Sequence, residues 1–318
     1  MDTTTHVTIG IGLAGLSFFD PTVAGNPELT MGILACTIIG SNAPDIDCLY
    51  KLKGNETYVQ HHRGLSHSLP VIMLLATIIA TIMTLFYSGS YFFTFFTWSL
   101  VAVFLHVIVD ICNIYGTQAL RPFTKKWLAL NVLPIFDPTI MILHIIGFIA
   151  WGIGFPQALT FAFIYLLISC YVLLRILKAR NILFALKQNS KDGETYTLIP
   201  TFSMNSWTVI ASCEENYRLG KYEKDTITWL KRIEKTSDEN QIIKAAKQNH
   251  FVHHLLQYSP YLHAKIVKIK DGYEVHWFDL RYQSRIDEPF VAIIYLDQQL
   301  NLIRSYVKRG LITVPEKI

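Results

Sequence analysis

The sequence predicts a mainly α-helical protein, in which a polytopic helical membrane bundle is followed by a small soluble α+β domain. Of its 318 residues 51% are hydrophobic and only 16% are charged, and the mean hydropathy is +0.32, which is too apolar for an ordinary soluble chain. Residues 1–177 carry 15 charged side chains and residues 178–318 carry 37. We therefore expect a membrane-embedded domain over 1–177 and a soluble domain over 178–318.

Two long uncharged stretches predict four clear spans. The first, residues 68–105, has no charged side chain in 38 positions, and the second covers residues 138–174. Turn-forming residues divide each stretch in two, at 88–90 and at 152–156. Because about 20 apolar residues cross a hydrocarbon core, the spans are expected near 69–87, 92–112, 139–155 and 157–177.

Two shorter apolar segments precede these spans, at 7–19 and 29–43. At a rise of about 1.5 Å per residue they fall short of a core about 30 Å thick. They are expected to be short or re-entrant helices, and ordinary spans with longer ends are the alternative.

The basic residues of the membrane half fall in alternate loops, which predicts the orientation of the chain. The Lys and Arg residues concerned are Lys51, Lys53, Arg63, Arg121, Lys125, Lys126 and Arg175. By the positive-inside rule these loops, both termini and the C-terminal domain are cytoplasmic in a multi-pass protein of the cell membrane.

The C-terminal part has the pattern of antiparallel strands with one helix. Strands are expected within 196–202, 207–213, 226–229, 266–277 and 290–303, with turns at 271–272 and 297–299, and the helix at 238–248. This part carries a net charge of +5, which is too mild to predict direct nucleic-acid binding.

Histidine and carboxylate are costly in a bilayer, so those in or beside the spans are candidates for a functional site. His106 and Asp110 are four residues apart and share one face of a helix, the spacing that lets one helix supply two ligands to one metal site. The alternative is that Asp110 only orients the His106 imidazole by a hydrogen bond.

Two further clusters lie outside the spans. Asp45 and Asp47 follow the helix-breaking Pro44 and can turn to one cation, although a solvated loop would look the same. His62 and His67 can face one ion if the chain bends at Gly64.

The predicted topology brings all these groups to one cytoplasmic edge, together with His6 and Asp137. His6, Asp45, Asp47, His62, His67, His106, Asp110 and Asp137 are therefore the predicted ligands of a divalent metal ion, and zinc suits this set of His and Asp.

Five ordered motifs together resemble a known bacterial family. They are Thr5-His6, Pro44-Asp45-Ile46-Asp47, His62-Arg63-Gly64-Leu65-Ser66-His67-Ser68, His106-x-x-x-Asp110, and Tyr115-Gly116 through Arg121-Pro122-Phe123. Over residues 1–175 the chain resembles the membrane-bound metal-dependent hydrolase-like proteins, also described as LexA-regulated or LexA-binding inner-membrane proteins. That family is distantly similar to zinc phospholipase C, which implies phosphoester cleavage. Ser66 stands where the family usually has Thr, and only one H-x-x-x-D pair is visible where the phospholipases have two.

The leading hypothesis is a metal-dependent hydrolase of a phosphoester, and in particular of a lipid, at the cytoplasmic membrane face. Asp47 is a candidate proton acceptor or bridging ligand, and Arg63 and Arg121 are candidates to offset charge on the phosphate. One alternative is a non-catalytic membrane regulator or scaffold that binds a transcription factor or another protein. A metal or ion transporter is the third hypothesis.

Overall fold

The computed structural model describes all residues except 55–56, 59–60, 88–90, 189, 191–192, 251, 254–255, 257–260, 283–290, 310–311 and 316–318. The turn predicted at 88–90 and the first residue of the strand predicted at 290–303 therefore lie outside the described residues. The chain divides into two compact units, of which the first comprises Met1–Phe184 and Pro200–Ser206 and the second comprises Ala185–Ile199 and Trp207–Ile318.

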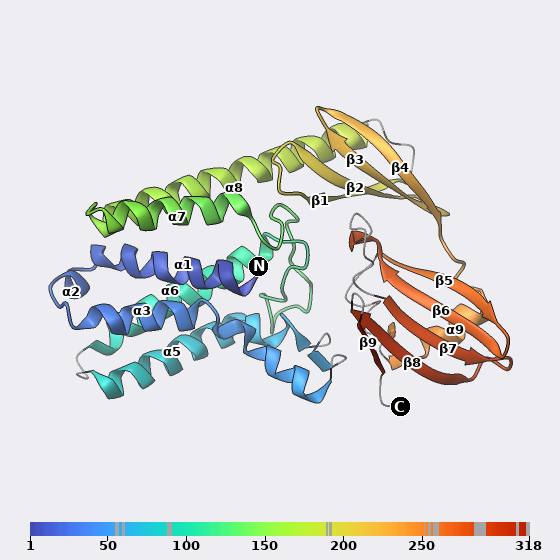
Figure 1. Ribbon diagram of the computed structural model, residues 1–318, viewed down its shortest axis with the longest axis horizontal. Coiled ribbons are helices and arrows are strands. Elements are labelled where there is room, and N and C mark those ends of the chain that lie inside the picture. Colours follow the sequence, from blue (N-terminus) through green and yellow to red (C-terminus); the bar gives the residue numbers. More distant parts are fainter. Residues whose placement is uncertain are drawn as a thin grey trace. The chain divides into compact units, whose positions relative to one another are not determined.

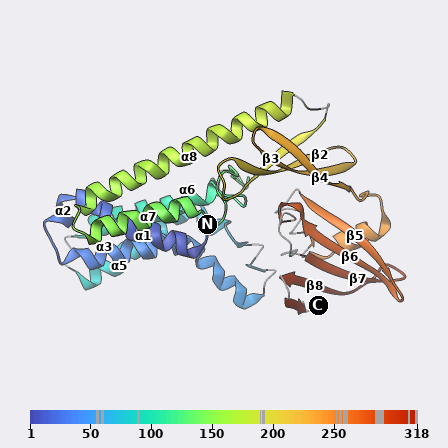
Figure 2. The ribbon, with the colours of Figure 1, turned by 45° about the horizontal axis from the view of Figure 1, so that its top comes forward.

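The first unit is a bundle of antiparallel helices (Figure 1). Its described helices are α1 (Thr3–Leu16), η1 (Ser17–Phe19), α2 (Pro21–Ala24), α3 (Leu29–Gly40), η2 (Ala43–Lys53), η3 (Leu65–His67), α5 (Leu69–Phe86), α6 (Phe92–Ile111), α7 (Pro138–Gly152) and α8 (Gln157–Gln188). Both views show α1, α5 and α7 beginning at the end of the bundle where α3 and α6 finish (Figures 1 and 2). We call this the ligand end, because it carries most of the predicted ligand residues.

The number of clear spans differs from the predicted four. Among the described residues three helices, α5, α6 and α8, are long and apolar enough to cross a membrane. The helix α7 has 15 residues and is shorter than the predicted span. The pair α3 and η2 is bent by 50°, and counts as a fourth span only if the two are taken together.

The helix α8 is longer than predicted and contains the predicted domain boundary at 177/178. It continues through Lys178 and Arg180 to Gln188. Leu, Ala, Lys and Arg are all good helix formers, so the change from an apolar to a charged sequence does not end the helix.

Small residues let α1, α3 and α6 approach closely, as is common in membrane bundles. A Cβ atom at Gly10 would lie 2.8 Å from the carbonyl oxygen of Thr37, and one at Gly40 would lie 3.0 Å from that of Ser99. Both distances are too short for a side chain. These contacts bring the middle of α1, the end of α3 and the middle of α6 together.

Residues 112–137 connect α6 to α7 in an irregular loop over the ligand end. Its chain is held by backbone bridges between Asn113 and Leu133 and between Thr117 and Leu128. Gly116 has a φ of 65°, and a Cβ atom there would collide with the Leu128 carbonyl group. The loop therefore needs glycine at this position.

The second unit contains two sheets and a helix. The first sheet has the order β1 (Thr195–Pro200), β2 (Ser206–Ser212), β3 (Asn216–Glu223) and β4 (Thr226–Glu234). The second has the order β5 (Leu262–Ile269), β6 (Gly272–Asp279), β7 (Val291–Asp297), β8 (Leu302–Arg309) and β9 (Ile312–Pro315), with each neighbouring pair antiparallel.

The helix α9 (Gln241–Lys247) packs on β6 and β7, and its N-cap Asn240 accepts a hydrogen bond from the Ile242 backbone. The predicted helix and both predicted hairpins are confirmed in their described parts, whereas β3 and β9 were not predicted. The C-terminal part is thus an α/β arrangement of antiparallel sheets, as the sequence pattern indicated.

Candidate metal centre at the ligand end of the bundle

The structure gathers seven of the eight predicted ligand residues in one cluster at the ligand end. His6 lies in the first turn of α1, and Asp45 and Asp47 lie in η2. The others are His62, His67 in η3, and His106 and Asp110 in the last turns of α6. Residues separated by up to a hundred positions therefore meet at one place.

Four side chains form the first ligand group: Asp45, His67, His106 and Asp110. Each offers one oxygen or nitrogen atom, and these atoms lie within 4.8 Å of one another. The Nε2 atoms of His67 and His106 are 3.2 Å apart. Oδ2 of Asp110 lies 3.4 and 3.6 Å from these two nitrogens, and Oδ1 of Asp45 lies 3.7 and 3.8 Å from them.

Hydrogen bonds on the far side of each imidazole fix where its proton lies. Nδ1 of His106 is 2.7 Å from the carbonyl oxygen of Ser41, which can only accept, so this nitrogen carries the proton. Ser66 donates its hydroxyl proton to Asp47 and accepts from Nδ1 of His67 at 2.9 Å. In both neutral rings Nε2 therefore carries a lone pair and no proton.

Burial keeps His67 in this neutral form. Burial itself, the nearby His106 and the Arg63 guanidinium together hold the pKa of His67 well below its ordinary value. Protonation is thus not available near neutral pH to relieve the close approach of the two Nε2 lone pairs.

The two carboxyl groups of the first group each direct one buried oxygen toward the imidazoles. Among the described residues, Oδ1 of Asp45 and Oδ2 of Asp110 accept no hydrogen bond, and Oδ2 of Asp110 is 3.2 Å from Nη2 of Arg63 as an ion pair. Two lone-pair nitrogens and two carboxylate oxygens thus converge. Such a set is complementary to a cation, and two His with two Asp match the ligand types of zinc.

A second group, formed by Asp45, Asp47 and His62, shares Asp45 with the first. Nδ1 of His62 lies 2.8 Å from Oδ1 of Asp47. Oδ2 of Asp47 accepts hydrogen bonds of 2.8 Å from the Arg63 backbone N–H and from the Ser66 hydroxyl. Asp47 is therefore firmly oriented, and Asp45 is the carboxylate placed to bridge two ions.

His6 and Arg63 support the first group from the side. The His6 ring stacks on His106 with centroids 3.8 Å apart, and its Nε2 is 3.4 Å from Oδ1 of Asp110. The Met1 amino group also contacts that oxygen. The Arg63 guanidinium is buried and donates from Nη1 to Oδ1 of Asn113 at 3.1 Å.

Two predicted site residues lie outside the cluster of seven, although Asp137 is at the ligand end, where α7 begins. Asp137 is the N-cap of α7, where it accepts hydrogen bonds from the backbone of Thr139 and Ile140 and from the Tyr171 hydroxyl. It is in neither ligand group. Arg121 is partly exposed, and its buried Nε has no hydrogen-bond partner among the described residues.

Three residues of this site were missed by reasoning from the sequence. They are Ser41, whose carbonyl orients His106, Ser66, which connects His67 to Asp47, and Asn113, which donates to Oδ1 of Asp110 at 3.2 Å. Asn113 follows Asp110 by three residues and lies just past the end of α6. Ser41 acts through its backbone carbonyl, which every residue has, so the sequence gives no sign of its role.

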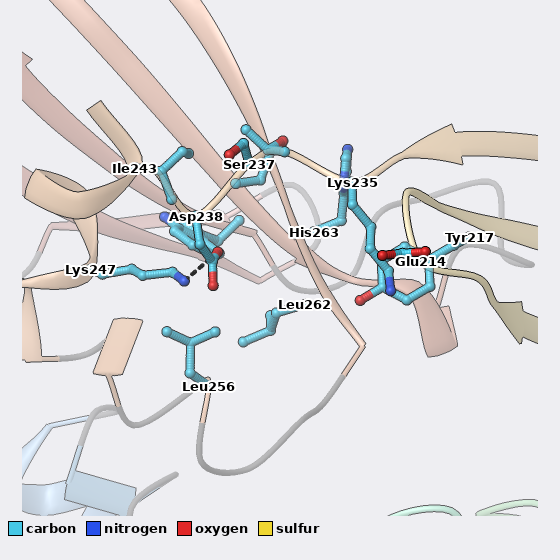
Figure 3. A pocket seen from close by; sticks show the side chains of 13 residues that line it. Glu214, Tyr217, Lys235, Ser237, Asp238, Ile243, Lys247, Leu256, Leu262 and His263 are labelled. Atoms are coloured by element: carbon cyan, nitrogen blue, oxygen red, sulfur yellow. Dashed lines mark hydrogen bonds and ion pairs between the residues drawn. The ribbon is translucent and has the colours of Figure 1, made fainter. Parts of the chain in front are cut away.

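The C-terminal unit has a separate cavity of about 450 Å³, lined by side chains from both sheets and α9 (Figure 3). Lys247 and Asp238 form an ion pair of 2.6 Å at its wall. Within the part of this unit that the structure describes, no three His, Cys, Asp or Glu side chains converge as they do at the ligand end.

The comparisons with known proteins match this chain in two places. Residues 1–182 match the family described as the YdjM inner membrane protein, and residues 241–312 match the YfhP C-terminal alpha/beta plait domain. The chain belongs to the YdjM inner membrane protein family. It is also 37% identical over 320 residues to the uncharacterized protein YfhP of Bacillus subtilis (strain 168), covering 100% of this chain and 97% of that protein. No solved structure matches.

Membership of the YdjM family agrees with the apolar helices and places the chain in the cell membrane. The matched residues 1–182 include the whole candidate metal centre. The second match lies in the unit built from sheets.

Proposed function

We propose that this chain is a metal-dependent phosphoester hydrolase whose active centre is at the ligand end of the bundle. The observation that carries the proposal is the first ligand group. Four side-chain atoms that can bind a cation, from Asp45, His67, His106 and Asp110, face one another, and among the described residues only Arg63 brings a cationic group to one of them. A buried arrangement of this kind is costly unless a cation is bound.

A first divalent ion, with zinc as the best fit, would be held by Asp45, His67, His106 and Asp110, and a second by Asp45, Asp47 and His62. When bound, such ions lower the pKa of a water molecule and polarise a phosphoryl oxygen. The N–H of Arg63 and the Ser66 hydroxyl hold Asp47 in place, and the Ser41 carbonyl holds His106.

The two arginines have different roles in this proposal. Arg63 is buried against Asp110 and Asn113, so it offsets carboxylate charge inside the centre. Arg121 is partly exposed, and we propose that its guanidinium binds the phosphate group of the substrate. Its loop is tied to the histidine segment, because the backbone of Gln118 donates to Arg63 and that of Leu69 donates to Ala119.

The test uses the full-length protein, purified in detergent and assayed for metal content and for hydrolysis of p-nitrophenyl phosphate, bis-p-nitrophenyl phosphate and dioleoyl phosphatidic acid. We expect at least one zinc ion per chain and turnover of one or more of these esters. Chelation should abolish turnover and added Zn²⁺ should restore it. Full turnover by metal-free protein, or bound metal without turnover of any phosphoester, would contradict the hydrolase proposal.

The ligand end is proposed to face the cytoplasm, because the basic residues of the membrane half lie in the loops at this end. A cysteine-free protein with a single cysteine introduced at Lys125 should react with a membrane-impermeant maleimide only after the cells are opened. A second protein with its cysteine at Asn26, in the loop between α2 and α3, should react in intact cells. The reverse pattern would overturn the orientation without affecting the assignment of the ligands.

A further inference from the structure

A groove of about 280 Å³ lies in the helical bundle between α1, α6, α7 and α8. Its walls are almost entirely hydrocarbon, with His144, Tyr165, Ser169 and Cys112 as the side chains that carry a polar group or a thiol. This groove is separate from both ligand groups.

The groove runs along the helices. On α6 its wall is formed by Leu105, Ile108, Val109 and Cys112, which are spaced by three and four residues and therefore share one face. On α8 the wall extends from Tyr165 to Ile176, which corresponds to about 16 Å along the helix axis. A long and narrow apolar groove parallel to the spans is complementary in shape to an extended hydrocarbon chain of a bilayer lipid.

One end of the groove adjoins the candidate metal centre. Val109 and Cys112 stand on either side of Asp110 on α6, and Ile9 is three residues from His6 on α1. Leu133 also lines this end, and its backbone N–H donates to the carbonyl of Cys112. A chain lying in the groove would therefore carry its polar end toward the ligand residues.

The outer wall of the groove is accessible from the side. Ile108 is 39% exposed and Leu173 is 54% exposed, although both line the groove. In a bundle embedded in a membrane these side chains face lipid rather than water. A lipid chain could thus enter laterally without crossing an aqueous phase.

The groove also contains one buried imidazole, that of His144. The ring is fully buried, its Nδ1 donates to the carbonyl of Ile140 at 2.8 Å, and its Nε2 has no hydrogen-bond partner in the described part of the chain. The neighbouring Tyr165 hydroxyl is used elsewhere, since it donates to the carbonyl of Ile9 at 2.7 Å. A buried acceptor without a donor is unfavourable, so a water molecule or a hydroxyl group is expected beside His144.

We propose that this groove binds one hydrocarbon chain of a phospholipid whose phosphate group is presented at the ligand end. The assignment of that lipid as the substrate rests on the proposed hydrolase function, whereas binding of the chain does not. The observations that support it are the apolar walls, the length along α8, the lateral opening and the shared helices α1 and α6.

The test uses the full-length protein in dioleoyl phosphatidylglycerol vesicles that contain a few per cent of a phosphatidic acid with a photoreactive diazirine near the end of one chain. After irradiation we expect the label to be concentrated on residues 105–112 and 165–176. Unlabelled dioleoyl phosphatidic acid in tenfold excess should compete with this labelling. Val172→Trp, which fills the groove, should reduce labelling of these segments at least fivefold.

The matched control is Leu166→Trp, which adds the same bulk to an exposed position of α8 outside the groove. It should leave the labelling unchanged, and both variants should keep the metal content of the wild type. Uniform labelling of all lipid-facing helices in the wild-type protein, or labelling that Val172→Trp does not reduce, would overturn the proposal. Concentrated labelling in a protein without metal would refute the hydrolase function and leave the lipid groove standing.

Discussion

Replacing Asp110 with asparagine is expected to remove the bound metal ion from the full-length protein while the helices remain inserted. The amide keeps the size of the side chain and its capacity to accept hydrogen bonds, but it loses the negative charge that a divalent ion requires. We expect zinc affinity to fall by about 100-fold or more, and hydrolysis to be lost with the metal. Metal analysis of the purified variant, with circular dichroism to verify the helices, measures both effects.

Two control variants separate this effect from general damage. Asp20→Asn makes the same chemical change at the N-cap of α2, far from the ligand groups, where asparagine also caps a helix. His61→Ala removes an exposed imidazole whose contacts among the described residues are a hydrogen bond to the Thr57 carbonyl and stacking on Tyr50. Both proteins should retain the wild-type metal content.

The Asp110→Asn variant also distinguishes a metal ligand from a residue that only orients His106. If Asp110 served only to orient His106, asparagine would be tolerated. The Ser41 carbonyl already orients that imidazole from the other side, at 2.7 Å. Stoichiometric metal in a folded Asp110→Asn protein would therefore count directly against Asp110 as a ligand.

Most of the candidate site could be predicted from the sequence because its residues interrupt apolar segments. His106 and Asp110 stand out in an uncharged helix, and the alternation of spans brings the other polar motifs to the same end. The same argument included Asp137, which the structure places at the start of α7 as its cap. Asp-Pro-Thr at 137–139 is itself a helix-start signal, since Asp is a favoured N-cap and Pro a favoured first residue.

The rest could not be predicted because it depends on packing rather than on composition. The close contact of α1 and α3 at Gly10 decides that His6 reaches His106, and a glycine in an apolar segment does not specify its partner. The bend between α3 and η2 likewise depends on how Pro44 and the following carboxylates meet the rest of the bundle. Span counting from hydropathy gave four spans because it included 139–155, where α7 has only 15 residues, and three described helices are long enough on their own.

Arg175 was taken from the sequence only as a topology signal, yet the structure buries it completely in α8. Its Nε donates to the carbonyl of Val132 at 2.5 Å and its Nη2 to that of Thr201 at 3.1 Å. Its Nη1 donates to the Tyr171 hydroxyl at 3.0 Å, and that hydroxyl donates to Asp137. One guanidinium thus ties α8 to the end of the 112–137 loop and, through Tyr171, to the cap of α7.

Arg175→Ala is therefore expected to lower the free energy of unfolding by about 3–5 kcal/mol, because it leaves several buried acceptors without a donor. Arg180→Ala, at an exposed position of the same helix, should change it by less than about 0.5 kcal/mol. Unfolding in mixed micelles with increasing sodium dodecyl sulfate, followed by circular dichroism, compares the two variants. Arg175→Lys should lie between them, since lysine keeps the charge but cannot donate in three fixed directions. Equal unfolding midpoints for Arg175→Ala and Arg180→Ala would show that the network around Arg175 does not stabilise the bundle.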